Sequence, residues 1–193
     1  MKKSLLLKTA LAIALASPLL ASAESARTVG PGAAAARLDF RVIVPRVLFL
    51  AVGEGAAGLA ANTTVGTVTF DYSTNATDLG TGAAALVTSG TGVPVRVLGN
   101  GGVIALASTN TGLLTNAATP TDTIPWSEIT VVSSETLFPS PAPGGGTVNL
   151  GVSSGKVTNR TANWTFSYAN TAVVPPGTYG TTNGRVTYTA TMP

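Results

Sequence analysis

Histidine and cysteine are both absent from the 193 residues. Without cysteine the fold cannot be held by disulfides, so packing and sheet hydrogen bonds must stabilise it. Without histidine the chain lacks the commonest general base and the commonest metal ligand. We therefore predict that the protein is not an enzyme and that it holds neither a cofactor nor a metal.

The first 23 residues have the pattern of a secretory signal peptide. Lys2, Lys3 and Lys8 form a basic beginning, a short apolar run follows, and Ala21-Ser22-Ala23 is a small-residue cleavage site. This pattern predicts export and cleavage before Glu24. No later stretch is long and apolar enough to cross a bilayer, so we expect no membrane insertion. We expect a bacterial protein secreted through the periplasm to the cell surface or beyond.

Charge is also scarce, because charged residues make up 10% of the chain and the precursor has a formal net charge of +3. Cleavage of residues 1–23 removes three lysines and leaves eight basic residues against eight acidic ones. A mature chain without net charge has no general electrostatic attraction for nucleic acid or anionic lipid. We expect neither as a partner.

Helix-forming stretches are nearly absent after residue 23, whereas short apolar runs separated by Gly, Pro and Asn recur. The glycine-rich turn at 99–102, Gly-Asn-Gly-Gly, predicts a tight hairpin between strands at 93–97 and 103–107. Trp164, Phe166 and Tyr168 lie on one face of another strand, which favours the core over a sugar-binding surface for Trp164 and Tyr168. The sequence predicts an all-β, immunoglobulin-like antiparallel β-sandwich.

Both ends of the expected domain have apolar residues at every second position, and in the last strand the alternation with polar residues is strict. We expect a flexible lead at 24–36, followed by a single sandwich domain at 37–193. Near its beginning, within 37–44, the apolar residues of one face are Leu38, Phe40, Val42 and Val44. In the last strand they are Val186, Tyr188, Ala190 and Met192, and the other face carries Arg185, Thr187, Thr189 and Thr191.

Other candidate sites are weaker. Asp71, Asn75 and Asp78 could offer oxygens to calcium, but Asp and Asn at this spacing are more typical of a turn that bonds its own backbone. Trp126 and Tyr179 could contribute to an aromatic surface for sugar.

The approach to the last strand carries a family resemblance. Pro176-Gly177-Thr178-Tyr179, with Gly180 fourteenth from the end, precedes the alternating terminal strand. This ending resembles the closing motif of bacterial chaperone–usher-type pilins, including spore coat protein U-like fimbrial subunits. The chain departs from that family in lacking a disulfide and in having Met192 where an aromatic is common.

The resemblance implies an incomplete sandwich that is completed by a strand from a neighbouring subunit. Leu38, Phe40, Val42 and Val44 would then be the donor strand, and Val186, Tyr188, Ala190 and Met192 the acceptor edge. Identical subunits would form a head-to-tail filament, served by a periplasmic chaperone and an outer-membrane usher.

Alternation alone does not distinguish a donated strand from an ordinary first strand of a complete sandwich. Two hypotheses therefore stand at this point. The first is a structural subunit of a pilus-like filament or surface coat. The second is a monomeric secreted module that binds carbohydrate or another surface ligand through Trp126, Tyr179 and polar turn residues.

Overall fold

The computed structural model describes residues 24–53, 59–85, 87–89, 92–180 and 183–193. The predicted signal peptide at 1–23 lies outside these residues. Residues 24–44 and residues 45–193 form separate units, and each is described by itself. All of the strands that the structure describes lie in the second unit.

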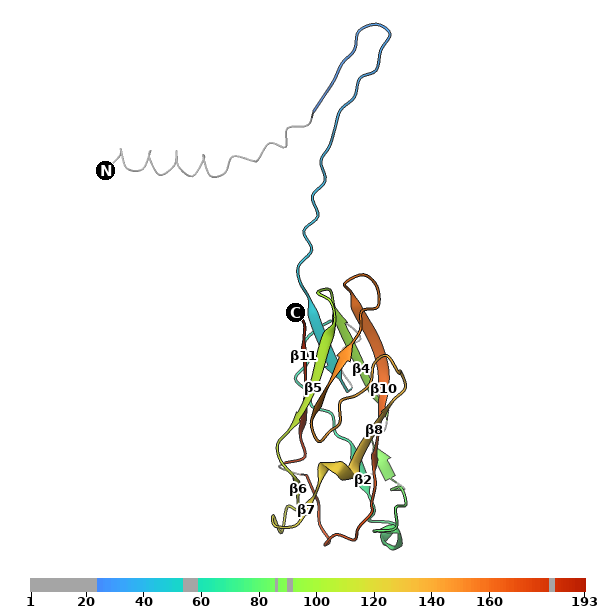
Figure 1. Cartoon of the computed structure of the whole chain (residues 1–193), viewed down its shortest axis with the longest axis vertical. Coiled ribbons are helices and arrows are strands. Elements are labelled where there is room, and N and C mark those ends of the chain that lie inside the picture. The colour runs from blue at the N-terminus through green and yellow to red at the C-terminus, as the bar shows by residue number, and fades with distance from the viewer. Residues whose placement is uncertain (1–23, 54–58, 86, 90–91, 181–182) are drawn as a thin grey trace, which may run out of the picture. The chain divides into compact units, whose positions relative to one another are not determined.

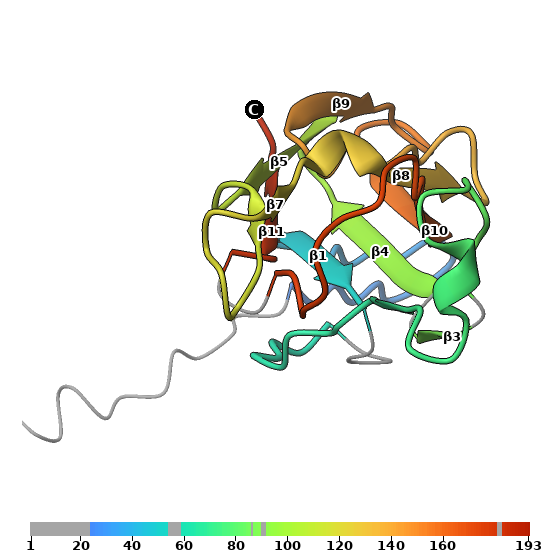
Figure 2. The same ribbon diagram turned by 90° about the horizontal axis from the view of Figure 1, so that it is seen from below.

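Two antiparallel sheets form a sandwich in the described part of the second unit (Figure 1, Figure 2). The first sheet has the order β1 (Leu48–Val52), β4 (Val93–Gly99), β10 (Thr158–Tyr168), β8 (Ile129–Ser133). The second has the order β11 (Val186–Thr191), β5 (Ile104–Asn110), β9 (Gly146–Leu150). The predicted all-β sandwich is confirmed.

The remaining elements are short. They are the pair β2 (Thr69–Asp71) and β3 (Val87–Ser89), the pair β6 (Leu114–Thr115) and β7 (Thr123–Ile124), and the 3-10 turns η1 (Ala76–Asp78) and η2 (Trp126–Glu128). Among the residues that the structure describes, no helix has the length and apolar character needed to cross a membrane.

The core lies between the facing sheets. Its fully buried apolar residues are Val95, Val97, Ile104, Leu106, Phe138, Leu150 and Trp164. Trp164, predicted to be in the core, has no exposed surface. Its ring centroid lies 5.7 Å from that of Phe138 and 5.0 Å from that of Tyr188, so an aromatic cluster joins β10, β11 and the segment after β8.

The prediction of a hairpin at the glycine-rich turn is wrong. β4 and β5 belong to different sheets, so the turn carries the chain across the sandwich instead of joining neighbouring strands. Val95 and Val97 of β4 and Ile104 and Leu106 of β5 are all buried, because both strands direct their apolar faces into the same core. Gly102, with φ of 117°, supplies the left-handed conformation that this crossing needs.

One side of the sandwich is covered by the chain itself. After β8, residues 134–145 run past the edges of β8 and β9, and Phe138 and Pro141 become fully buried. The Ser133 hydroxyl donates to the carbonyl of Phe138 at 2.7 Å, and the Ser108 hydroxyl donates to that of Ala142 at 2.6 Å. This Pro- and Gly-rich segment has no regular structure, yet it closes the core on this side.

Replacing Phe138 with alanine should lower the free energy of unfolding by about 3–5 kcal/mol, because a buried aromatic leaves a cavity. Chemical denaturation followed by tryptophan fluorescence measures the change, since Trp164 contacts the ring. Leu137→Ala is the matched control, because Leu137 is 62% exposed and its replacement should change stability by less than about 0.5 kcal/mol. Equal effects of the two substitutions would contradict the role given to this segment.

Candidate functional site

The opposite side of the sandwich, formed by β1 and β11, is called the open side below. β1 pairs with β4 and β11 pairs with β5, and neither has a second strand neighbour within the described residues. The two strands lie near each other at the same side of the sandwich (Figure 2). Each therefore presents an unpaired edge, which is a template for an added strand.

The free backbone groups of these edges belong to even-numbered residues. In an antiparallel ladder, alternate residues bond the partner strand and the others direct both backbone groups away from it. Thr111 N–H donates to the Arg185 carbonyl at 3.3 Å, so the odd-numbered residues of β11 bond β5. Gly53 N–H donates to the Pro94 carbonyl at 2.9 Å, so the odd-numbered residues of β1 bond β4.

The side chains of the even-numbered residues on both strands are apolar, and most of them are half-buried. On β11 burial alternates, with exposed threonines between the inward residues, as the period-2 pattern predicts. The half-buried even-numbered residues of the open side are Leu50, Val52, Val186, Tyr188, Ala190 and Met192. The sequence predicts only the last four of these residues as part of an acceptor edge. It missed β1 as the second edge, because "LFLAV" is apolar on both faces.

Tyr188 anchors β11 in the core. Burial raises the pKa of its phenol, and Ser140 has a weaker, opposing effect. The Ser140 hydroxyl donates to the Pro141 carbonyl at 2.9 Å, and the buried Tyr188 oxygen has no hydrogen-bond partner in the described structure. The strand is thus held by apolar packing on Trp164 and by the β5 ladder.

One end of the open side is built by the glycine-rich turn. The Asn100 side chain accepts from Val47 N–H at 2.8 Å and donates to the Pro45 carbonyl at 2.7 Å. Arg46 donates to the carbonyl of Met192 at 3.2 Å, so β1 begins where β11 ends and the two strands run in opposite directions. Sequence reasoning missed these contacts, because Asn100 had been interpreted only as a turn residue.

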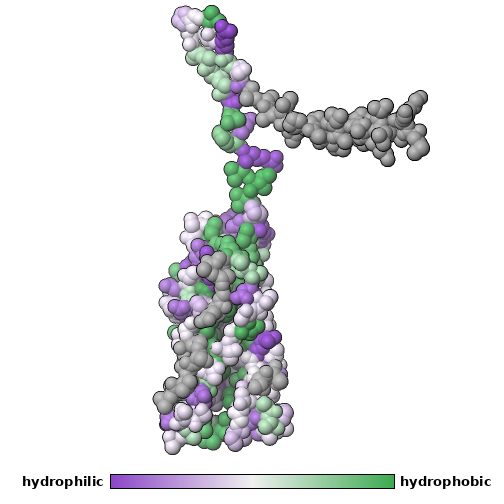
Figure 3. Space-filling model, turned by 180° about the vertical axis from the view of Figure 1, so that it is seen from behind, coloured by the Kyte–Doolittle hydropathy of each residue, from purple (hydrophilic) through white to green (hydrophobic). Residues whose placement is uncertain are grey.

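Residues 24–44, the first unit, contain no strand. The side chains predicted to be donated are strongly exposed, from 71% for Leu38 to 87% for Phe40. Figure 3 shows apolar and hydrophilic residues following one another along the described residues of this unit. Without a partner edge these residues have no ladder to join, although their sequence alternates.

The closing motif forms a compact corner before β11. Tyr179 donates its hydroxyl to the carbonyl of Pro175 at 2.8 Å, a contact like the tyrosine corner of immunoglobulin-like domains. Asn116 is buried and donates to the Pro176 carbonyl at 3.1 Å. An added Cβ on Gly177 would clash with Asn116, which explains glycine at this position. The motif therefore fixes where the last strand begins.

The weaker candidates make contacts of their own. Trp126 donates to the Gly112 carbonyl and is half-buried. Asp71 accepts from Ser73 N–H at 2.8 Å, which lowers the pKa of its carboxyl, and Asn75 bonds Asp78. Within the described residues no group of three acidic side chains is placed to hold a metal.

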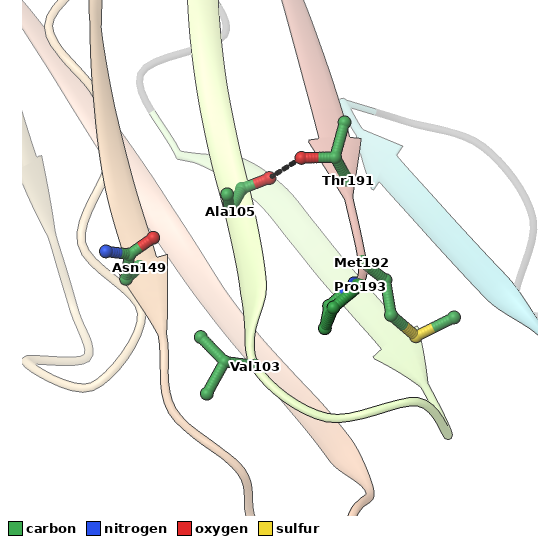
Figure 4. Close-up of a pocket in the computed structure, with 6 residues that line it drawn as sticks. All are labelled: Val103, Ala105, Asn149, Thr191, Met192 and Pro193. Carbon is green, nitrogen blue, oxygen red and sulfur yellow. Dashed lines mark hydrogen bonds between the residues drawn. The ribbon is translucent and has the colours of Figure 1, made fainter.

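A shallow hollow of about 370 Å³ lies on the second sheet, at the end where β11 stops (Figure 4). It is lined by Val103, Ala105, Asn149, Thr191, Met192 and Pro193. None of these side chains titrates, so the hollow offers no side chain that could act as a general acid or base.

Comparison with protein-family models, curated proteins and solved structures finds no match to this chain. The open side is the feature of the second unit with a definable chemistry, which is strand pairing.

Replacing Tyr188 with phenylalanine should change how stability depends on pH. The folded pKa of this phenol is raised, so its stabilising effect is complete below about pH 10 and is lost as pH rises further. Tyr188→Phe should flatten that alkaline loss, and at pH 7 it should be neutral or slightly stabilising because an unpaired buried hydroxyl disappears. Urea unfolding at pH 7 and at pH 10.5 measures both, and an unchanged pH dependence would contradict the assignment.

Proposed function

We propose that the protein is a structural subunit of an extracellular filament or surface coat. In this proposal, residues 38–44 of one copy add as a strand to the open side of the next copy. The observation that carries it is the pair of unpaired edges with half-buried apolar residues on β1 and β11, in a chain whose exposed residues 38–44 have the matching alternation.

The two surfaces match in length and spacing. Four apolar residues, Leu38 to Val44, recur at every second position, and so do the four on the last strand, Val186 to Met192. An antiparallel added strand that directs these side chains inward also directs the backbone groups of the same residues toward the free groups of β11. Burying the four side chains would contribute about 2 kcal/mol each, before any ladder hydrogen bonds.

Donor and acceptor are different parts of one chain, so the contact between copies is heterologous. A heterologous contact that does not close into a ring propagates as a filament. Before assembly the open side would expose apolar surface, and such edges aggregate unless they are covered. This favours the periplasmic chaperone and outer-membrane usher that the pilin-like ending suggests as partners.

The binding-module hypothesis has less support. The polar atoms of Trp126 and Tyr179 already bond carbonyls of the chain. Neither ring is fully exposed, so no aromatic platform for sugar is apparent at either residue.

Replacing Val42 with aspartate should lower the amount of multimer at least tenfold, because a charge would enter a buried position of the added strand. Ile43→Asp is the matched control, since Ile43 is also strongly exposed in the free segment but would lie on the outward face of the added strand. Gel electrophoresis of the mature protein and of a sheared surface fraction, with and without boiling in detergent, measures the multimers.

The expected wild-type result is a ladder of bands that collapses to monomer only on boiling. A single monomer band under both conditions would overturn the filament proposal and favour the binding module. Equal loss of the ladder in both variants would show that the alternation of residues 38–44 is not what is recognised.

A further inference from the structure

If strand addition is the function, residues 38–44 of a chain compete with those of a second copy for the open side of their own domain. Residues 38–44 are joined to β1 by only three residues, 45–47. A hairpin with its turn at these residues would place Val42 beside Leu50 on the free edge of β1. Short flexible links give effective concentrations in the mM range. Self-insertion would then outcompete a second copy at μM concentration, unless something opposes the turn.

The structure contains such an opposing element in its second unit. The Asn100 side chain makes two hydrogen bonds, and both are with residues 45–47, which connect residues 38–44 to β1. One is with the carbonyl of Pro45 and the other with the N–H of Val47. The backbone N–H of Asn100 also donates to the carbonyl of Val47 at 3.3 Å, which continues the β1–β4 ladder by one pair. Val47 is therefore paired with Asn100 through both of its backbone groups.

Arg46 and Met192 hold the same connection from the other strand. Arg46, the residue between the two that Asn100 binds, donates to the Met192 carbonyl. The sulfur of Met192 lies 3.0 Å from the backbone nitrogen of Gly101. A turn at 45–47 would change the backbone course at the three residues that Asn100 and the Met192 carbonyl hold.

We propose that Asn100 is a positioning residue that keeps residues 38–44 out of the open side of their own domain and leaves them available to a second copy. Its carboxamide suits this role because it has one acceptor and one donor group, which match the N–H of Val47 and the carbonyl of Pro45.

The test uses the mature chain with Asn100→Ala, Asn100→Asp and, as the matched control, Asn163→Ala. Asn163 is exposed on β10, and its side chain makes no hydrogen bond in the described structure. Asn100→Ala should raise the ratio of monomer to detergent-resistant multimer about tenfold. Asn100→Asp keeps the acceptor for Val47 but loses the donor for Pro45, so it should have a smaller effect. Circular dichroism confirms that each variant is folded.

A cysteine pair reports the insertion directly, because the natural chain contains no cysteine. Val42→Cys with Leu50→Cys should form an intramolecular disulfide when the chain inserts into itself, since paired strand residues lie within bridging distance. With Asn100 present, this pair should give little cross-linked monomer on a non-reducing gel. With Asn100→Ala added, cross-linked monomer should become the main product.

Multimers that are equally abundant with and without Asn100 would overturn the positioning role while leaving the filament proposal intact. Abundant cross-linked monomer in the presence of Asn100 would overturn it too. A wild-type chain that forms no multimer, together with a Val42→Cys and Leu50→Cys chain that forms no cross-link, would instead remove the filament proposal itself.

Discussion

The unpaired edges of β1 and β11 are the constraint on which the rest of this structure depends. A sandwich of two sheets has two open flanks, and each must be covered or left as a site for pairing. On the β8–β9 flank the chain covers itself with residues 134–145, which place Phe138 in the core. On the β1–β11 flank the described chain supplies no such cover, so half-buried apolar residues remain at the surface.

The fold class could be predicted from the sequence, and so could the side of the last strand that faces the core, because period-2 alternation determines which face of a strand is buried. The partner of each strand could not. The Gly-Asn-Gly-Gly turn suits a hairpin as well as a crossing between sheets, and only the burial of Val97 and Ile104 in one core distinguishes the two. The β1 edge was missed for a similar reason, since Leu50 lies in a run without polar residues.

Strand pairing also accounts for what the composition lacks. Recognition between strands uses backbone hydrogen bonds and alternate apolar side chains, so it requires neither charge nor titratable groups. The scarcity of charge and the lack of histidine are therefore compatible with the proposed strand exchange. The outward residues of β11 are threonines, which favour extended structure and are compatible with water.

Under the proposed strand exchange, a chain with both a donated strand and its acceptor would also have to prevent the two from meeting within one molecule. Length alone cannot do this, because a short connection raises the local concentration of the segment. Local backbone geometry can, since a hairpin requires a turn at a defined place. The contacts of Asn100 with Pro45 and Val47 fall on the residues where that turn would form. The choice between a monomer and a filament would thus rest on one side chain in the turn between β4 and β5, at the end of the open side where β1 begins.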